Sequence, residues 1–269
     1  MQKIYIDSRF RTANSKSESD FNVELPRSFN VPDGVVAHID DIVIPVSWRT
    51  VDGRNNLCYI EFLEGVEFDE HCLVLDVNNY DGPLFAAALQ AKLTTAIQGF
   101  ASNVAFVCTC DVKENQLTIS IVDTRPNKAT VPFHLRILAD NEIIANRKGE
   151  PTTVNTIIRN TASILISGTE SYTCYLDLFN TRNLYLTSSA LCSYDTVNNF
   201  GMDTIIKKIP CTAKYNMMIF QSSGSTLDGL DVSKRSLRYL DFKLVDSNFR
   251  PIDLQGNHFS FSIVFHQKR

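Results

Sequence analysis

Residues 237–244 read Leu-Arg-Tyr-Leu-Asp-Phe-Lys-Leu, and Leu240, Phe242 and Leu244 fall on one side of an extended chain. A period of two is typical of a strand with one buried face. The alternation returns over residues 259–265, where four large apolar side chains share a face. Four such side chains, each worth about 1.5–3 kcal/mol when fully buried, predict that this strand lies at the centre of a β-sandwich.

Shorter alternating segments of the same kind occur on both sides of a central region that has a helix-like pattern. Residues 21–25, 35–48 and 57–62 precede that region, and further segments between residues 172 and 221 follow it. With the two closing strands they number about eight, the number that builds a jelly roll from two Greek keys. The predicted fold class is therefore mainly β: a single jelly-roll β-sandwich with an inserted small α+β domain.

The central region contains the one long predicted helix. Asp81 can cap its first turn and Pro83 suits its opening position. Its apolar stripe is formed by Leu84, Ala88, Leu89, Leu93, Ala96 and Ile97. Strands are predicted at residues 104–110, 116–122 and 133–138, and together with the helix they provide a small core of their own.

These patterns predict a discontinuous domain organisation. Residues 20–64 plus 165–269 form the jelly-roll domain, and residues 65–164 form the inserted α+β domain. Two β domains in series are the rival, but the part before residue 65 would then supply only three strands, which make a poor closed sandwich.

Residues 1–19 are mostly charged or polar, and only Ile4-Tyr5-Ile6 could form a short strand. Such a segment buries little apolar surface. We therefore expect a flexible N-terminal arm that is either mobile or held by a partner.

Bulk composition limits the possible functions. The chain has 269 residues, 44% of them hydrophobic, a formal net charge of -4 and a pI near 5.7. This balance argues against a protein whose main task is binding a nucleic-acid backbone, which normally needs a basic face. No run approaches the roughly 18 apolar residues of a membrane span, and the first residues do not resemble a signal peptide. We expect no membrane span and a protein made and kept inside a cell.

Cysteine spacing gives little sign of metal or redox chemistry. There are seven, an odd number: Cys58, Cys72, Cys108, Cys110, Cys174, Cys192 and Cys211. Most lie in apolar strand-like contexts, where a reduced thiol behaves as a small hydrophobe. Cys108 and Cys110 share one face of a predicted strand, but no second Cys or His pair stands at metal-site spacing.

The remaining polar residues do not form a recognisable catalytic motif. The five histidines, His38, His71, His134, His258 and His266, show no metal-binding pairing. Neighbours on a strand point to opposite faces, so Asp40 and Asp41 are not expected to share a site. Cation binding by Asp228 and Asp231 is an alternative to a solvated turn. No catalytic, cofactor-binding or metal-binding residue is predicted, no cofactor is expected, and the protein is not expected to be an enzyme.

Basic residues are densest in the second half of the chain. They are Lys207, Lys208, Lys234, Arg235 and Arg238. They could face nucleic acid inside a shell or acidic surfaces of neighbouring subunits, and a solvated face is the default interpretation.

Several stretches resemble one known family. They are Asp7-Ser-Arg-Phe-Arg-Thr12, Ser19-Asp-Phe-Asn-Val-Glu-Leu25, Asp41-Ile-Val-Ile-Pro-Val-Ser-Trp48, Asn183-Leu-Tyr-Leu-Thr-Ser188, Ile205-Ile-Lys-Lys-Ile-Pro210 and Ile252-Asp-Leu-Gln-Gly256. Together they resemble the minor capsid (penton) proteins of Polinton/Maverick elements, adintovirus-like viruses and virophages. The resemblance covers both flanks of the central region.

The resemblance implies a structural protein of the virion, assembled inside the host cell. It implies a single jelly roll that forms a homopentamer at the five-fold vertices of an icosahedral capsid, beside trimers of a double-jelly-roll major capsid protein. It also implies an inserted outer domain, through which a host receptor could be contacted, and an N-terminal arm that orders against neighbours.

Two other classes of function stay open at this stage. One is a receptor- or glycan-binding β-sandwich module, whose sites would be loops with exposed aromatic side chains such as Tyr80 or Tyr194. The other is an enzyme built on a cupin-like roll, which the missing histidine ligands disfavour.

Overall fold

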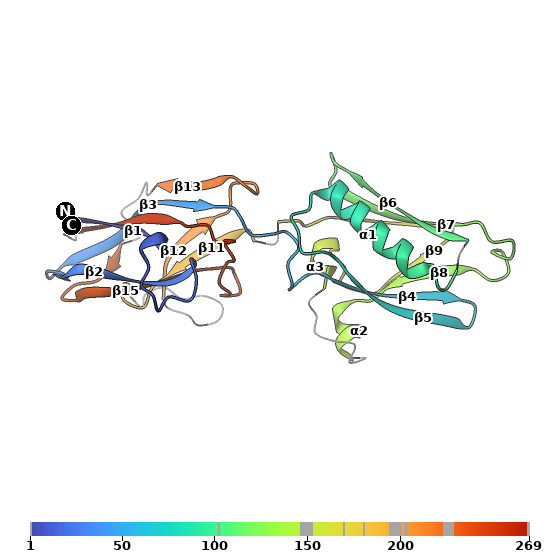
Figure 1. Cartoon of the computed structure of the whole chain (residues 1–269), viewed down its shortest axis with the longest axis horizontal. Coiled ribbons are helices and arrows are strands. Elements are labelled where there is room, and N and C mark those ends of the chain that lie inside the picture. The colour runs from blue at the N-terminus through green and yellow to red at the C-terminus, as the bar shows by residue number, and fades with distance from the viewer. Residues whose placement is uncertain are drawn as a thin grey trace. The chain divides into compact units, whose positions relative to one another are not determined.

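A computed structural model describes the chain at residues 2–101, 103–145, 153–168, 170–179, 181–193, 201, 204–222 and 229–267 (Figure 1). The chain divides into two compact units. Unit 1 comprises Met1–Trp48 and Thr181–Arg269, and unit 2 comprises Arg49–Asn180. Each unit has its own cluster of buried apolar side chains.

The part of unit 1 that the structure describes is built from two antiparallel sheets. Its elements are β1 (Gln2–Asp7), the 3-10 helix η1 (Ser8–Phe10), β2 (Asp20–Asn30), β3 (Val35–Pro45), β11 (Asn183–Thr187), β12 (Ile205–Pro210), β13 (Met218–Ser222), β14 (Leu230–Asp231), β15 (Ser236–Val245) and β16 (Ser260–Gln267). Sheet 1 has the strand order β1-β16-β3-β13, with β14 also paired to β3. Sheet 2 has the order β12-β11-β15-β2.

The two closing strands occupy central positions, as their sequence predicts. β16 lies between β1 and β3, and β15 lies between β11 and β2. Their apolar faces meet in the core of unit 1, where the ring centroids of Phe242 and Phe261 are 4.9 Å apart. Phe21 of β2 is fully buried there and contacts Phe242 and Phe259. Two sheets packed face to face through these rings form a β-sandwich.

The N-terminal segment is part of this sandwich, which corrects the expected flexible arm over residues 1–19. β1 pairs with β16 from Gln2↔Phe265 to Asp7↔Ser260, and the side chain of Ile6 is buried in the core. Farther along, the backbone amides of Lys16 and Ser17 both bond the carbonyl of Asp20. The segment is polar overall, but the buried side chain of Ile6 and the backbone hydrogen bonds to β16 are enough to order it.

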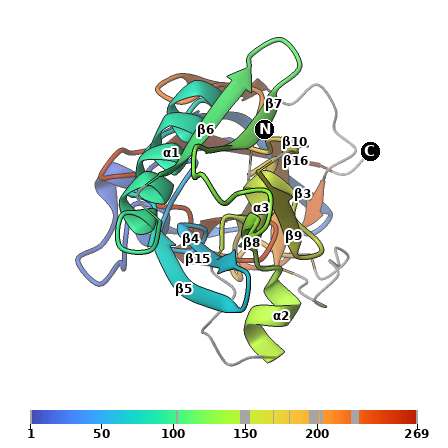
Figure 2. The ribbon, with the colours of Figure 1, turned by 90° about the vertical axis from the view of Figure 1, so that its right-hand side faces the viewer.

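In its described residues, unit 2 combines two further antiparallel sheets with three helices (Figure 2). Its elements are β4 (Leu57–Glu64), β5 (Glu67–Val74), α1 (Gly82–Ile97), β6 (Val104–Asp111), β7 (Gln116–Asp123), β8 (Phe133–Ile137), α2 (Asp140–Ala145), α3 (Asn155–Ile158), β9 (Ile164–Ser167) and β10 (Ser171–Tyr175). Sheet 3 has the order β5-β4-β8-β9, and sheet 4 has the order β10-β7-β6. Phe62 of sheet 3 and Phe106 of sheet 4 stack in the core between them, with ring centroids 5.8 Å apart.

The predicted helix is present as α1. The carboxylate of Asp81 accepts a hydrogen bond from the Leu84 amide at 2.9 Å, and Pro83 lies in the first turn. The buried face is rotated from the expected stripe, because Phe85, Leu89 and Leu93 are buried whereas Leu84 is exposed. Every third or fourth residue still faces the core, which is the spacing that packing of a helix on one side requires.

The boundaries of the units differ from those expected at residues 64/65 and 164/165. Glu64 pairs with Glu67, so Gly65 and Val66 form the two-residue turn of the β4–β5 hairpin. Gly65 has a φ of +61°, a conformation that glycine adopts readily and that hairpin turns need. β9 and β10 pair with β8 and β7, which places residues 165–180 in unit 2 as well. Unit 2 is therefore larger at both ends than the sequence predicts.

A buried arginine ties two strand ends of unit 2 together. The Arg125 side chain is only 7% exposed and forms an ion pair with Asp123, Nη2 to Oδ2, at 2.6 Å. Glu64 at the end of β4 is its second ionic partner, and the ring of Phe133 lies under the guanidinium. Hydrogen bonding from Arg125 lowers the pKa of the Asp123 carboxyl below its usual value. Because these charged groups are removed from water, each is stabilised by its ion-pair partner, and removing Arg125 would leave the carboxylates of Asp123 and Glu64 without a cation.

Arg125→Met is expected to lower the free energy of unfolding of unit 2 at pH 7 by about 3 kcal/mol, because two carboxylates lose their buried cation. Stabilisation from a carboxyl with a lowered pKa exists above its unfolded pKa, and it disappears as the pH falls through the folded pKa. The difference between variant and parent should therefore shrink in urea unfolding experiments at pH 3. The exposed pair Arg54 and Asp52 has the same spacing, so Arg54→Met is the matched control, expected to change stability by less than about 1 kcal/mol. An equal loss at both pH values would contradict the ionic explanation.

Candidate interaction surfaces

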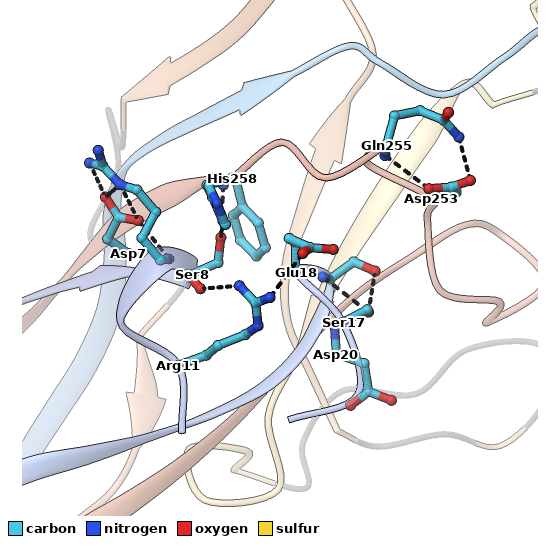
Figure 3. Close-up of polar contacts among 12 residues, drawn as sticks. Asp7, Ser8, Arg11, Ser17, Glu18, Asp20, Asp253, Gln255 and His258 are labelled. Carbon is cyan, nitrogen blue, oxygen red and sulfur yellow. Dashed lines mark hydrogen bonds and ion pairs between the residues drawn. The ribbon is translucent and has the colours of Figure 1, made fainter. Parts of the chain in front are cut away.

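A polar cluster fixes the N-terminal turn of unit 1 to the loop before β16 (Figure 3). The buried Ser8 hydroxyl accepts a hydrogen bond from the Phe259 amide at 3.1 Å and lies 3.3 Å from His258 Nδ1. Arg11 donates to the Ser8 carbonyl at 3.2 Å and to a carboxylate oxygen of Glu18 at 2.9 Å. These hydrogen bonds provide partners for the polar groups of the turn that follows β1, so the cluster holds the end of that strand in place.

Two acidic side chains of β3 lie beside the same lysine, which corrects the expectation that they point to opposite faces. Lys3 Nζ is 2.8 Å from an Asp40 oxygen and 3.9 Å from an Asp41 oxygen. The register of β3 against β16 shifts between Phe261 and Ile263, leaving an extra residue on β3. A β-bulge of this kind turns neighbouring side chains toward one side. The hydrogen bond that Lys3 donates to Asp40 raises the pKa of Lys3, and the charge of Asp41 raises it further, despite the desolvation of the ammonium group.

The outer face of sheet 1 carries large exposed side chains. Tyr5 and Phe10 are each 76% exposed, Phe220 is 67% exposed and Met218 is 55% exposed. Tyr5, Phe10 and Val43 are among the residues that line a shallow hollow of about 390 Å³. Phe220 pairs with Val43 across the strands and therefore borders the same region. We call Tyr5, Phe10, Val43, Met218 and Phe220 the aromatic face, because its composition matches that of protein interfaces.

The outer face of sheet 2 is more polar. Glu24 accepts hydrogen bonds from Arg238 and from the Tyr239 hydroxyl, and the bond from Tyr239 is the first cause of its lowered pKa. Lys243 pairs with Asp20 at 3.5 Å. The two faces of the sandwich therefore differ in chemistry.

The predicted basic residues are distributed among separate contacts. Lys234 pairs with Asp33 at 3.1 Å, Arg238 pairs with Glu24, and Arg235 donates to the carbonyls of Ala190 and Cys192. Lys207 and Lys208 lie on β12. Several of these charges stabilise the fold itself, which lessens their availability to a polyanion.

The other candidate binding residues are not brought together. Tyr80 is buried, and its hydroxyl donates to the Asp76 carbonyl at 3.1 Å, so it is not an exposed aromatic anchor. Asp231 accepts a hydrogen bond from the Ser233 amide. Tyr194 and Asp228 lie outside the described residues.

The buried cysteines have environments that suppress thiolate chemistry. Burial raises the pKa of Cys58 and of Cys108 to about 12 and that of Cys174 to about 11. Within the described ranges, no three His, Cys, Asp or Glu side chains converge as a metal site would need. In the same part of the chain, no helix has the length and apolarity to span a membrane.

Comparison with known proteins identifies a fold relative. No protein-family model matches the chain, and no curated protein matches it. Among solved structures, the crystal structure of selenomethionine-labelled mavirus penton protein aligns with a TM-score of 0.56 and 10% sequence identity. The alignment covers 99% of this chain and 99% of that chain. The likeness at this identity is one of fold: a mainly β chain that matches a penton protein over its whole length.

Proposed function

We propose that unit 1 is a single jelly roll and that unit 2 is a domain inserted into it. The longer strands that the structure describes in unit 1 are eight; in chain order they are β1, β2, β3, β11, β12, β13, β15 and β16. The first pairs with the eighth, the second with the seventh, the third with the sixth and the fourth with the fifth. Such nested pairing is a long antiparallel hairpin rolled into two sheets, the arrangement of a jelly roll. Unit 2 lies in the connection between the third and fourth strands.

We propose further that the protein is a structural subunit at the vertices of an icosahedral capsid. The observation that carries this proposal is the full-length likeness in fold to the mavirus penton protein. In this role the chain is a non-enzymatic component of the virion, assembled inside the host cell as a homopentamer. Its neighbour in the shell is a double-jelly-roll major capsid protein, as the resemblance in sequence implies.

The aromatic face supports assembly through unit 1. Tyr5 and Phe10 lie near β1 at one edge of sheet 1, while Met218 and Phe220 lie on β13 at the other edge. Apolar groups at both edges allow each subunit to contact its neighbours with two different surfaces. Such head-to-tail contacts close into a ring when the rotation between subunits permits.

The assembly proposal is tested by multi-angle light scattering and negative-stain imaging of the whole chain, alone and mixed with a double-jelly-roll major capsid protein. Phe220→Ser is expected to raise the concentration needed for half-assembly by at least about tenfold, because a large exposed aromatic contact at the β13 edge is lost. Tyr239→Ser, an equally exposed aromatic on sheet 2, is the matched control and should change it by less than about threefold. A monomer at every concentration, with no rings in the mixture, would rule out the vertex role.

Unit 2 is proposed to contact the host, through a receptor or a glycan. The outer side of sheet 3 supports this, because Phe68, Val74 and Leu165 are exposed there rather than packed in the core. Exposed apolar groups at a sheet face are typical of interaction sites. Binding of the whole chain to a glycan array and to host cells tests the idea, and an absence of signal in both assays would remove it.

A further inference from the structure

Strands β1 and β13 are the outer strands of sheet 1. In the described part of the chain, β1 pairs only with β16 and β13 pairs only with β3 (Figure 1). Both strands carry exposed apolar side chains, Tyr5 on β1 and Met218 and Phe220 on β13. An exposed edge strand can template the pairing of a further strand.

The free edge of β1 presents the backbone groups of every second residue. The Ser8 amide donates to the Phe259 carbonyl at 3.0 Å, so Ser8 points toward β16, as do the residues two and four positions before it. The N–H and C=O groups in between point away from the sheet, and they belong to Lys3, Tyr5 and Asp7. No hydrogen bond from the described residues reaches these groups.

β13 presents its free edge in the same way. The Val46 amide donates to the Met217 carbonyl at 2.8 Å, so alternate residues after Met217 also point toward β3. The backbone groups of Met218, Phe220 and Ser222 therefore point outward. They too receive no hydrogen bond from the described part of the chain.

Neither edge carries the features that usually prevent strand pairing. Exposed edges are commonly guarded by a lysine, a proline or a bulge. β13 reads Met-Ile-Phe-Gln-Ser and has neither a charged residue nor a proline. β1 contains Lys3, but its ammonium group reaches across β16 to Asp40 on β3, at 2.8 Å, and leaves the edge open. Both edges are therefore suited to pairing with another strand.

The two edges match in direction and in face. All three pairings across sheet 1 are antiparallel, so β1 and β13, separated by β16 and β3, run antiparallel to each other. A second copy placed edge to edge in the same orientation therefore offers its β1 antiparallel to β13. Ile6 and Ile219 are buried in the core, so on both strands the outward backbone groups belong to residues with side chains on the outer face.

We propose that β1 of one subunit adds to β13 of the next, with Tyr5 opposite Phe220, and that sheet 1 thereby continues from subunit to subunit. This inference rests on the proposed homopentamer and specifies how its subunits bond. The cross-strand pair joins two aromatic side chains that are otherwise in water, and the hollow beside Tyr5 leaves room for the incoming ring. Pairing of either strand with its own copy would cover one edge and leave the other exposed, whereas this contact covers both.

Disulfide cross-linking of the whole chain tests the register, in which Lys3 lies opposite Ser222. The exposed Cys72 is first replaced in all variants as Cys72→Ser. Lys3→Cys and Ser222→Cys chains, mixed above the concentration of half-assembly and oxidised, should form a covalent dimer, because Cα atoms of a hydrogen-bonded pair lie about 5.5 Å apart. Each chain oxidised alone should stay monomeric. Asn22→Cys, exposed on the outer strand β2 of sheet 2, is the matched control for Lys3→Cys and should give no dimer.

Removal of one edge amide distinguishes an added strand from a contact between side chains. Ser222→Pro lacks the N–H that bonds the neighbour and should raise the concentration of half-assembly about tenfold over Ser222→Ala, which keeps it. Proline is tolerated at an edge position, and circular dichroism verifies that each variant is folded. If Lys3→Cys is unfolded, Asp7→Cys with Met218→Cys tests the same register.

The outcomes separate this inference from the vertex role. Rings without a disulfide between positions 3 and 222, or with an equally strong link to position 22, would overturn the strand pairing and leave the vertex role standing. Covalent dimers of either single variant alone, or equal assembly of Ser222→Pro and Ser222→Ala, would also overturn the pairing. Monomers at every concentration, alone and with a major capsid protein, would overturn the pairing and the proposed function together.

Discussion

Phe21→Ala is expected to lower the free energy of unfolding of unit 1 by about 4 kcal/mol and to leave unit 2 unchanged. The Phe21 ring is fully buried and contacts the rings of Phe242 at 5.7 Å and Phe259 at 5.6 Å. Removing it leaves a cavity bounded by two other aromatic side chains, which cannot collapse without moving both sheets. All three residues belong to the core cluster of unit 1.

Phe62→Ala is the reciprocal variant and should lower the stability of unit 2 by a similar amount, about 4 kcal/mol. Its ring lies among those of Phe100, Phe106 and Phe133. Hydrogen exchange followed by mass spectrometry at increasing urea concentrations resolves the two units, because peptides from each report separately. Each variant thus serves as the control for the other. Equal loss of protection in both units after either substitution would show that the two cores unfold as one.

A chain that begins at Ser8 is expected to fail to fold unit 1. The deletion removes β1, and with it the hydrogen-bonded partner of β16 along one edge and the buried side chain of Ile6. β16 would then become an edge strand with apolar side chains exposed, a state prone to aggregation. We expect loss of slow hydrogen exchange in β16 and insolubility of the truncated chain. If residues 1–19 were instead a mobile arm, their removal would leave the thermal midpoint unchanged.

Two single substitutions in β1 test how its side chains contribute to the stability of unit 1 without shortening the chain. Ile6→Ala should destabilise unit 1 by about 3 kcal/mol, because Ile6 is 2% exposed and packs in the core. Tyr5→Ala, on the adjacent residue with its side chain in solvent, should change stability by less than about 0.5 kcal/mol. Thermal unfolding of the full chain measures both. Equal effects would mean that β1 contributes backbone pairing alone.

Strong local patterns predicted elements of both units. The alternation at Leu240, Phe242 and Leu244 and its repetition after residue 259 predicted two closing strands in central positions, and both are present. Asp81 and Pro83 predicted where α1 begins. These signals are reliable because they are local. Alternating apolar residues identify a strand with one buried face, and an Asp followed by Pro identifies the first turn of a helix.

Features that depend on long-range pairing were not predictable in the same way. Gly65 was interpreted as a boundary, although it forms a hairpin turn, since a turn and a linker use the same residues. The approach of Asp40 and Asp41 to Lys3 results from a bulge, which strict alternation does not include. The strand at residues 2–7 has one fully buried side chain, that of Ile6, and is ordered by a partner more than 250 residues away.

The candidate surfaces were the least predictable part. Tyr80 was a candidate exposed aromatic, yet it is buried, because a tyrosine next to a turn can bond a local carbonyl.

The nested pairing of unit 1 has a consequence for synthesis on the ribosome. β1 and β2 emerge early, but their partners β16 and β15 are translated only after more than 200 further residues. The residues of unit 2 form a continuous stretch and leave the exit tunnel before β15 and β16 do, so this unit completes its fold first. The early strands must wait unpaired through that interval, and chaperones that shield nascent edges are expected to govern how much protein is produced in soluble form.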